Sequence, residues 1–193
     1  MKARNIILAS ASPRRKELIR YINHDVIIIP SKAEEAIEEG VANEEIPIRF
    51  ALLKAHDVAK EHFTDVVIGC DTVVIVDDII LGKPKNRADG RRMLHLLSGK
   101  THRVITGCAI ICGNEERYFS ETSEVTFYPL TDDEIESYLD FGEYADKAGS
   151  YAIQGKGMLF VRTINGDYPN IVGLPVARLS RELDDFLTSV PKD

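Results

Sequence analysis

The sequence predicts an α/β protein in which β-branched strands alternate with capped helices. Residues 65–81 contain two apolar β-branched runs and a turn signal, as expected for buried strands. Ser12 followed by Pro13 is typical of a helix start. Residues 43–61 repeat apolar side chains at helical spacing, which predicts an amphipathic helix. The length of 193 residues suits one sizeable domain or two small lobes around one cleft.

The composition argues against several classes of protein. Hydrophobic residues make up 44% of the chain and charged residues 28%, which is typical of soluble globular proteins. The net charge of -7 argues against broad electrostatic binding to nucleic acid or to an anionic membrane. A local cluster of cations can still bind a small anion. We therefore expect neither nucleic acid nor membrane among the partners.

The cysteines favour a reducing compartment. Cys70, Cys108 and Cys112 are odd in number and form no C-x-x-C pair, which argues against a disulfide framework or a zinc site. Cys108 and Cys112 lie in an apolar strand-like run and are expected in the core. The apolar run at the N-terminus is too short for a signal peptide, and no stretch approaches transmembrane length. We expect a cytoplasmic protein.

The N-terminal segment predicts a phosphate site. A short strand at 5–9 runs into a helix over 12–20, and the free amides and dipole of a helix start attract anions. Positive side chains at the start of a helix are repelled by the positive end of the helix dipole, so a purely structural role for this helix start does not explain why two arginines lie there. Arginine forks match phosphate oxygens. Two hydroxyls and two guanidiniums gather here: Ser10, Ser12, Arg14 and Arg15.

An acidic loop and a long helix come next. Residues 25–29 predict a second strand, and the loop over 31–36 contains Glu34-Glu35, which in isolation is most often a solvated pair. Lys54 lies at the edge of the apolar stripe of the helix over 43–61. It either extends from the core to solvent or reaches into a cleft.

The central hairpin carries a lone carboxylate. The strand over 66–76 contains Asp71, and a turn at Asp77-Asp78 leads to a returning strand at 79–81. A carboxylate in apolar strand sequence needs a cation, a metal or hydrogen bonds to stay charged. In the plainer interpretation Asp71 ends a strand and accepts a hydrogen bond from a turn amide. Lys83, just beyond the hairpin, favours a site at this end of the sheet.

The C-terminal half continues the alternation. The expected elements are a helix over 86–97, paired strands over 101–112 and 118–127, a helix over 131–141, a strand over 158–164 and a helix over 174–187. Asn86 with Asp89 and Thr131 with Glu134 resemble capping boxes at the starts of the first two helices. Residues 168–173 are expected to form a loop. The glycine-rich loop over 142–157 contains Glu143, Asp146, Lys147 and Gln154, and a polar loop of this length is usually functional.

Six motifs together resemble the Maf family, whose members are nucleoside triphosphate pyrophosphatases. Each motif alone is weak, but they follow the family's order over nearly the whole chain. They are Ser10-Ala-Ser-Pro-Arg-Arg15, Gly69-Cys-Asp-Thr-Val-Val74, Leu81-Gly-Lys-Pro84, Leu97-Ser-Gly-Lys-Thr-His102, Asp146-Lys-Ala-Gly-Ser-Tyr-Ala-Ile-Gln-Gly155 and Gly166-Asp-Tyr-Pro-Asn-Ile-Val-Gly-Leu-Pro175.

The resemblance implies a fold and an activity. The fold would be α/β, with a twisted mixed β-sheet flanked by helices and two lobes around a central cleft, as in Maf and inosine-triphosphate-pyrophosphatase-like proteins. Residues 1–193 would form a single domain, usually as a homodimer. The activity would be hydrolysis of a nucleoside triphosphate to the monophosphate and pyrophosphate with a divalent cation, Mg²⁺ or Mn²⁺. The residue types resemble the branch that acts on dTTP and UTP, with modified pyrimidine nucleotides as further candidates, and not the 7-methyl-GTP branch.

The resemblance also assigns roles to individual residues. Asp71 matches the proton acceptor, while Arg14, Thr72 and Gln154 match positions linked to substrate choice. The family's acidic loop reads Asp-x-Asp-Glu, and here it reads Lys32-Ala-Glu-Glu35, so Glu35 aligns with the final Glu and Glu34 is the neighbouring candidate. The expected catalytic residues are Asp71, Glu35, Lys54 and Lys83; the substrate-binding residues are Ser10, Ser12, Arg14, Arg15, Thr72, Lys147 and Gln154; and the metal ligands are Glu35 and Asp71.

The implied chemistry agrees with these residue types. Cations and a metal neutralise the triphosphate, and one or two carboxylates suffice for Mg²⁺, which keeps several waters. Two alternatives stay open. One is a purine-selective ITP or XTP pyrophosphatase, which relative turnover of ITP and dTTP would distinguish. The other is a nucleotide-sensing regulator of septum formation that acts without essential hydrolysis, which release of pyrophosphate would exclude.

Overall fold

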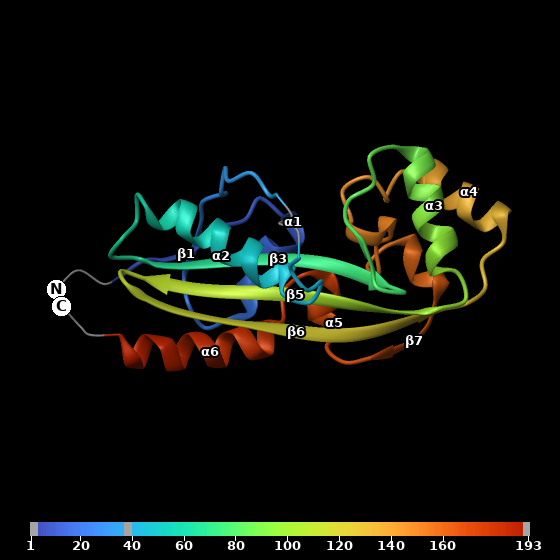
Figure 1. Ribbon diagram of the computed structural model, residues 1–193. Helices are drawn as coiled ribbons and strands as arrows, with labels where there is room; N and C mark the ends of the chain where they lie inside the picture. Colours follow the sequence, from blue (N-terminus) through green and yellow to red (C-terminus); the bar gives the residue numbers. More distant parts are fainter. Residues whose placement is uncertain (1–3, 37–39, 191–193) are drawn as a thin grey trace. The chain divides into compact units, whose positions relative to one another are not determined.

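The computed structural model describes residues 4–36 and 40–190. Its strands form a seven-stranded mixed sheet in the order β2-β1-β3-β5-β6-β7, with β4 paired to β3 (Figure 1). The predicted α/β class, with a mixed sheet flanked by helices, is therefore confirmed. The chain divides into two compact units. The first contains the residues up to Asp71, 106–121 and those from Gly173 onward, and the second contains 72–105 and 122–172.

The first unit begins with a parallel strand arrangement. Strand β1 (Ile6–Leu8) pairs in parallel with β2 (Val26–Ile28) and with β3 (Val66–Val76). Between β1 and β2 lie helix α1 (Pro13–Leu18) and the 3₁₀ turn η1 (Ile19–Tyr21). The predicted strands and the Ser12 cap are confirmed in this part of the chain.

Helices cover both faces of the sheet in the first unit. Alternation along β1 sends Ile6 and Leu8 to one face and Ile7 to the other. The first face packs against η1 and helix α6 (Val176–Ser189), and the second packs against helix α2 (Ile46–Ala59) (Figure 1). Cys108 and Cys112 are buried in the first of these cores, as predicted.

Two glycines allow α2 to lie directly on the backbone of the sheet. Gly69 is in β3 and Gly107 is in β5 (Thr101–Cys112), which turns into β6 (Glu115–Phe127). A Cβ at Gly69 would meet the carbonyl oxygen of Ala51, and a Cβ at Gly107 would meet the backbone of Pro47. Since both contacts are with helix backbone, neither could be relieved by a side-chain rotation. Helix α2 begins at Ile46, three residues later than predicted, and Pro47 suits a first turn.

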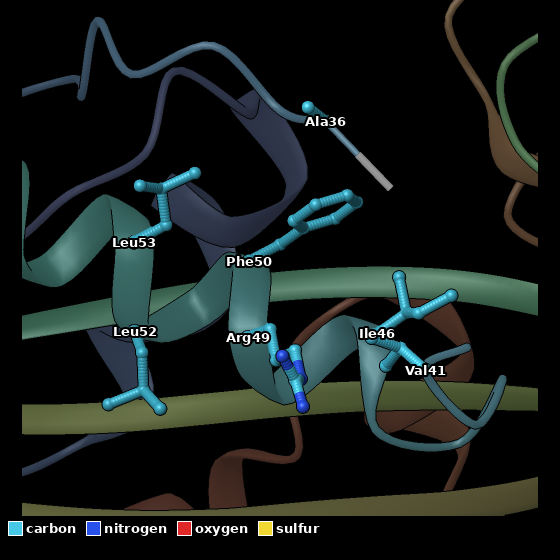
Figure 2. A pocket seen from close by; sticks show the side chains of 7 residues that line it. All are labelled: Ala36, Val41, Ile46, Arg49, Phe50, Leu52 and Leu53. Atoms are coloured by element: carbon cyan, nitrogen blue, oxygen red, sulfur yellow. The ribbon is translucent and has the colours of Figure 1, made fainter. Parts of the chain in front are cut away.

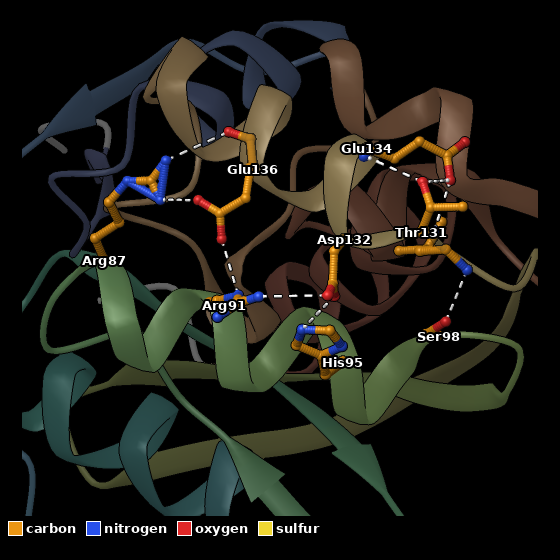
Figure 3. A network of polar contacts seen from close by, with 9 residues as sticks. Arg87, Arg91, His95, Ser98, Thr131, Asp132, Glu134 and Glu136 are labelled. Atoms are coloured by element: carbon orange, nitrogen blue, oxygen red, sulfur yellow. Dashed lines mark hydrogen bonds and ion pairs between the residues drawn. The ribbon is translucent and has the colours of Figure 1, made fainter.

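Ion pairs join the two main helices of the second unit. Helix α3 (Arg87–Leu97) is capped by Asn86, and helix α4 (Asp132–Phe141) has the predicted capping box between Thr131 and Glu134. The pairs shown in Figure 3 include Arg91 with Glu136 at 2.8 Å and His95 with Asp132 at 3.3 Å. These side chains are exposed, so we attribute the packing mainly to the buried faces of the helices.

The central hairpin of the second unit forms as predicted. Strand β4 (Ile79–Leu81) pairs antiparallel with the end of β3. Asp77 and Asp78 both have positive φ, at 49° and 59°, as a two-residue hairpin turn requires.

Two predicted elements of the second unit are wrong in their bounds or type. The strand expected over 158–164 is β7 (Val161–Asn165), because residues Lys156–Phe160 form the 3₁₀ turn η3 after a shorter turn, η2 (Ala148–Ser150). The loop expected over 168–173 contains the short helix α5 (Tyr168–Val172). The Asp167 carboxylate accepts a hydrogen bond from the Asn170 amide at 3.1 Å, which supports this helix start. Within the ranges 4–36 and 40–190, no helix combines the length and the apolarity that crossing a membrane requires.

Candidate functional site

Three predicted site residues of the first unit are in direct contact. The Lys54 ammonium donates a hydrogen bond to Asp71 Oδ1 at 2.7 Å and lies 2.7 Å from Glu35 Oε1. Asp71 is on β3, Lys54 is on α2 and Glu35 is on the loop between β2 and α2. The side chains of Asp71 and Lys54 are only 12% and 14% exposed, while that of Glu35 is 44% exposed. Lys54 therefore points toward the carboxylates, which settles the choice that the sequence left open.

Burial makes Asp71 a better proton acceptor than an ordinary aspartate. Its pKa is raised above 3.8, chiefly because burial disfavours the charged form. The positive charges of Lys54 and Arg15 oppose this rise, and the negative charge of Glu35 adds to it. The carboxylate thus combines a raised proton affinity with a nearby cation, which suits a general base.

The start of α1 contains the other predicted residues of the first unit. Ser12 Oγ caps the helix by accepting a hydrogen bond from the Arg15 amide at 3.5 Å, and Ser10 Oγ accepts one from the Ser12 amide at 3.2 Å. Both hydroxyls therefore hold the turn together. Arg15 Nε donates to the Gly173 carbonyl at 2.8 Å, which attaches the guanidinium to the segment just before α6. Arg14 is half-buried beside it.

The remaining predicted residues belong to the second unit. Lys83 and Gln154 are exposed, and Thr72 is half-buried. Lys147 donates from Nζ to the Glu143 carbonyl at 2.7 Å and to Asp146 Oδ1 at 2.6 Å. The Gly149 amide donates to the Gly82 carbonyl at 3.1 Å, so a backbone hydrogen bond joins the loops that carry Lys147 and Lys83.

Sequence reasoning missed two residues that contact the elements carrying this cluster. Gly107 is an isolated glycine inside an apolar strand, a pattern that indicates close backbone approach and that could have been used. Asp57, whose carboxylate accepts hydrogen bonds from Ser31 and Lys32, carries no such signal. Its partners are 25 and 26 residues away in the sequence, so only the folded chain identifies them.

Glu35 and Asp71 fit a hard divalent cation. Among the described residues, no group of three or more His, Cys, Asp or Glu side chains is placed to hold a metal. Glu35 and Asp71, however, each place an oxygen 2.7 Å from the same ammonium, so a site near Lys54 has two carboxylate donors. Mg²⁺ bound through one or two carboxylates completes its shell with water and substrate phosphates. Glu34 is exposed, and we find Glu35 to be the carboxylate that faces Lys54.

A pocket of about 310 Å³ lies along α2 (Figure 2). It is lined by Ala36, Val41, Ile46, Arg49, Phe50, Leu52 and Leu53. None of the predicted site residues lines it, although Ala36 follows Glu35 and Leu53 precedes Lys54. Its mainly apolar lining does not suit a triphosphate, which needs several cations or amides.

Comparisons with known proteins give a consistent result. A family model described as Maf-like protein matches residues 5–186. A dTTP/UTP pyrophosphatase of Bacillus mycoides (strain KBAB4) is 51% identical over 187 residues, which cover 97% of this chain and 98% of that protein. The dTTP/UTP pyrophosphatase of Bacillus cereus (strain Q1) is 50% identical over 183 residues, which cover 95% and 96%. The structure of the Staphylococcus aureus Ham1 protein resembles this chain with a TM-score of 0.57 at 17% identity, covers 95% of this chain and 100% of its own, and indicates a shared fold.

Proposed function

This chain belongs to the Maf family, and on that premise we propose that it is a nucleoside triphosphate pyrophosphatase that hydrolyses dTTP and UTP. The products would be the nucleoside monophosphate and pyrophosphate, as in house-cleaning of the nucleotide pool. The two Bacillus relatives named dTTP/UTP pyrophosphatase are 50% or more identical to this chain over nearly its full length. In the structure, the observation that supports the proposal most directly is the contact of Lys54 with both Asp71 and Glu35.

The cluster contains the groups that attack on phosphorus requires. In the proposed reaction Asp71 orients a water and accepts its proton while the water oxygen attacks the α-phosphorus. The bond between that phosphorus and the bridging oxygen breaks, and pyrophosphate leaves. Lys54 favours the ionised form of the buried Asp71 carboxylate and would add positive charge near the phosphates. Mg²⁺ or Mn²⁺ held by Glu35 and Asp71 would supply further charge neutralisation.

The other predicted residues complete the proposal. Ser10, Ser12 and Arg15 in the first unit would bind phosphate oxygens, and Lys83 and Lys147 in the second would do the same. The donors and acceptors of Arg14, Thr72 and Gln154 would recognise the carbonyl and imide edge of a pyrimidine. We further propose that residues 1–193 act as one catalytic domain, in a cytoplasmic homodimer.

A nucleotide panel tests the proposed function. Purified protein with Mg²⁺ or Mn²⁺ is incubated with dTTP, UTP, CTP, ITP and 7-methyl-GTP, and the products are identified by chromatography. We expect monophosphate and pyrophosphate, formed fastest from dTTP and UTP. The Asp71→Asn variant, which keeps the shape but cannot take a proton, should lose about a hundredfold or more in kcat. Diphosphate with orthophosphate would refute the cleavage position, and preferential turnover of ITP would favour the purine-selective alternative.

A further inference from the structure

The acidic loop that carries Glu35 is attached to α2 at two points. At its start, Asp57 Oδ2 accepts hydrogen bonds from the Ser31 hydroxyl and from the Lys32 amide, both at 2.8 Å. Four residues after Ser31, Glu35 Oε1 lies 2.7 Å from the Lys54 ammonium. Lys54 and Asp57 are three residues apart, so they lie on the same side of one helix. A single helix face thus holds both ends of this loop.

The loop is turned between these two points. The Ala33 amide donates to Ser31 Oγ at 3.0 Å, while the same hydroxyl donates to Asp57. Residues 31–33 are therefore fixed in one hydrogen-bonded unit. In the part of the chain that the structure describes, Asp57 is the α2 side chain that accepts hydrogen bonds from this unit. The path of this unit sets the direction in which the chain continues to Glu35.

Asp57 is not explained by the stability of α2 itself. It lies in the last turn of a helix that ends at Ala59, where a negative charge is unfavourable next to the helix dipole. Asp57 Oδ1 also lies 3.8 Å from the Lys60 ammonium, but this is a long ion pair with an exposed lysine and contributes little to stability. The pKa of Asp57 is lowered, chiefly by the Ser31 hydrogen bond and then by the Lys32 amide, so the carboxylate stays ionised and accepts both. These two contacts are local to the loop and contribute nothing to the hydrogen bonds within the helix.

We propose that Asp57 is a positioning residue that holds the loop of residues 31–35 on α2 so that Glu35 faces Lys54 and Asp71. This inference rests on the proposed function, and it adds a residue that acts through Glu35 without touching substrate. Loss of the Asp57 acceptor would free the start of the loop, and the Glu35 carboxylate would then sample positions away from the ammonium. Displacement of a site group by about 1 Å can lower the rate about a hundredfold.

Two substitutions separate the acceptor from the rest of the side chain. Asp57→Ala removes the acceptor, and we expect kcat/KM for dTTP to fall about 10- to 100-fold. Both hydrogen bonds end on the same oxygen, so Asp57→Asn can still accept them through its amide oxygen. We therefore expect Asp57→Asn to keep kcat/KM within about threefold of the unaltered protein. An Asn variant as impaired as the Ala variant would overturn the assignment to hydrogen bonding.

Asp65→Ala is the matched control in the same unit. The Asp65 carboxylate joins distant parts of the chain, accepting hydrogen bonds from the Asn5 amide at 3.0 Å and from the Asn5 side chain at 3.1 Å. Within residues 4–36 and 40–190, its hydrogen bonds reach no residue of the acidic loop. We expect Asp65→Ala to lower the melting temperature and to retain kcat/KM. If Asp65→Ala lost as much activity as Asp57→Ala, the effect would be one of general stability and the proposal would fail.

Amide hydrogen exchange tests the loop without any need for activity. In Asp57→Ala the amides of Lys32 and Ala33 should exchange faster, while the amides of α2 and β3 keep their protection. Unchanged exchange of Lys32 and Ala33 would overturn the proposal. If the unaltered protein released no pyrophosphate from any nucleotide, the proposed function would fail on its own, and the exchange result would still report whether Asp57 orders the loop.

Discussion

Replacing Gly69 by alanine probes the contact that brings Lys54 to Asp71. The added Cβ would stand 2.9 Å from both the Cβ and the amide nitrogen of Ala55, and closer still to the Ala51 carbonyl oxygen. Ordinary van der Waals contact begins at 3.4 Å. Helix α2 would therefore have to retreat by roughly half an ångström at Ala55 and by more at Ala51. Lys54 lies on the same stretch of helix, so its ammonium would move away from the carboxylate.

The size of the effect follows from these contacts. Overpacking a well-packed core costs about 1–3 kcal/mol, and the upper end applies because the closest obstructing atom, the Ala51 carbonyl oxygen, is backbone. Alanine also restricts the unfolded chain, which offsets about 0.4–1 kcal/mol. A net loss of about 2 kcal/mol lowers the melting temperature of a chain of this size by about 4–8 °C. The retreat of Lys54 should lower kcat/KM by about 10- to 100-fold.

Calorimetry and steady-state kinetics, performed well below the melting temperature, measure the two effects separately. Gly82→Ala is the matched control for stability, because a Cβ at Gly82 would meet no atom within 4 Å. We expect this control to melt no lower than the unaltered protein. A Gly69→Ala protein with unchanged stability and unchanged kcat/KM would show that the close approach of α2 and β3 does not position the cluster.

Three further predictions concern the carboxylates and the metal. The first compares the melting temperatures of Asp71→Asn and the unaltered protein in buffer with a chelator, and we expect the variant to gain on the unaltered protein as the pH goes from ~4 to ~8. The folded-state pKa of Asp71 is raised, so the unaltered protein loses stability as this carboxylate ionises, whereas Asn does not titrate. A difference in melting temperature that stays constant with pH would argue against a costly buried charge. Glu35→Gln should raise the Mg²⁺ concentration needed for half-maximal turnover, and Glu34→Gln should not, since Glu35 is the one of these two glutamates that pairs with Lys54 in the described structure; equal effects would place both carboxylates at the metal. Removing divalent cations with a chelator should abolish release of pyrophosphate and Mg²⁺ should restore it, whereas full turnover without metal would exclude the proposed role of Glu35.

Local sequence was enough to predict most of the elements. Ser12, Asn86 and Thr131 cap helices where the sequence indicates, and Asp77-Asp78 forms the expected hairpin turn. Caps and turns depend on hydrogen bonds and backbone preferences of residues a few positions apart, so the local sequence is enough to predict them. The differences lie where local signals are weak: β7 begins later than the sequence predicts, and residues 168–172, which the sequence predicts as loop, form the short helix α5.

Family motifs led to the site residues, and only the folded chain decided their contacts. The sequence could not say whether Lys54 faces solvent or a carboxylate, nor which of Glu34 and Glu35 it meets. The structure decides both, because Gly69 allows α2 to approach β3 and so places Lys54 between Asp71 and Glu35.

By itself, the sequence determined the class of the fold, its caps and turns, and the motif set that identifies the family. The tertiary structure alone determined the ion-pair geometry of the cluster, the raised pKa of Asp71 and the attachment of the acidic loop to Asp57. The physical reason is the separation in sequence of the residues that interact. Caps and turns are set by bonds between near neighbours, whereas burial and charge pairing depend on residues such as Ser31 and Asp57, which meet only after the chain has folded.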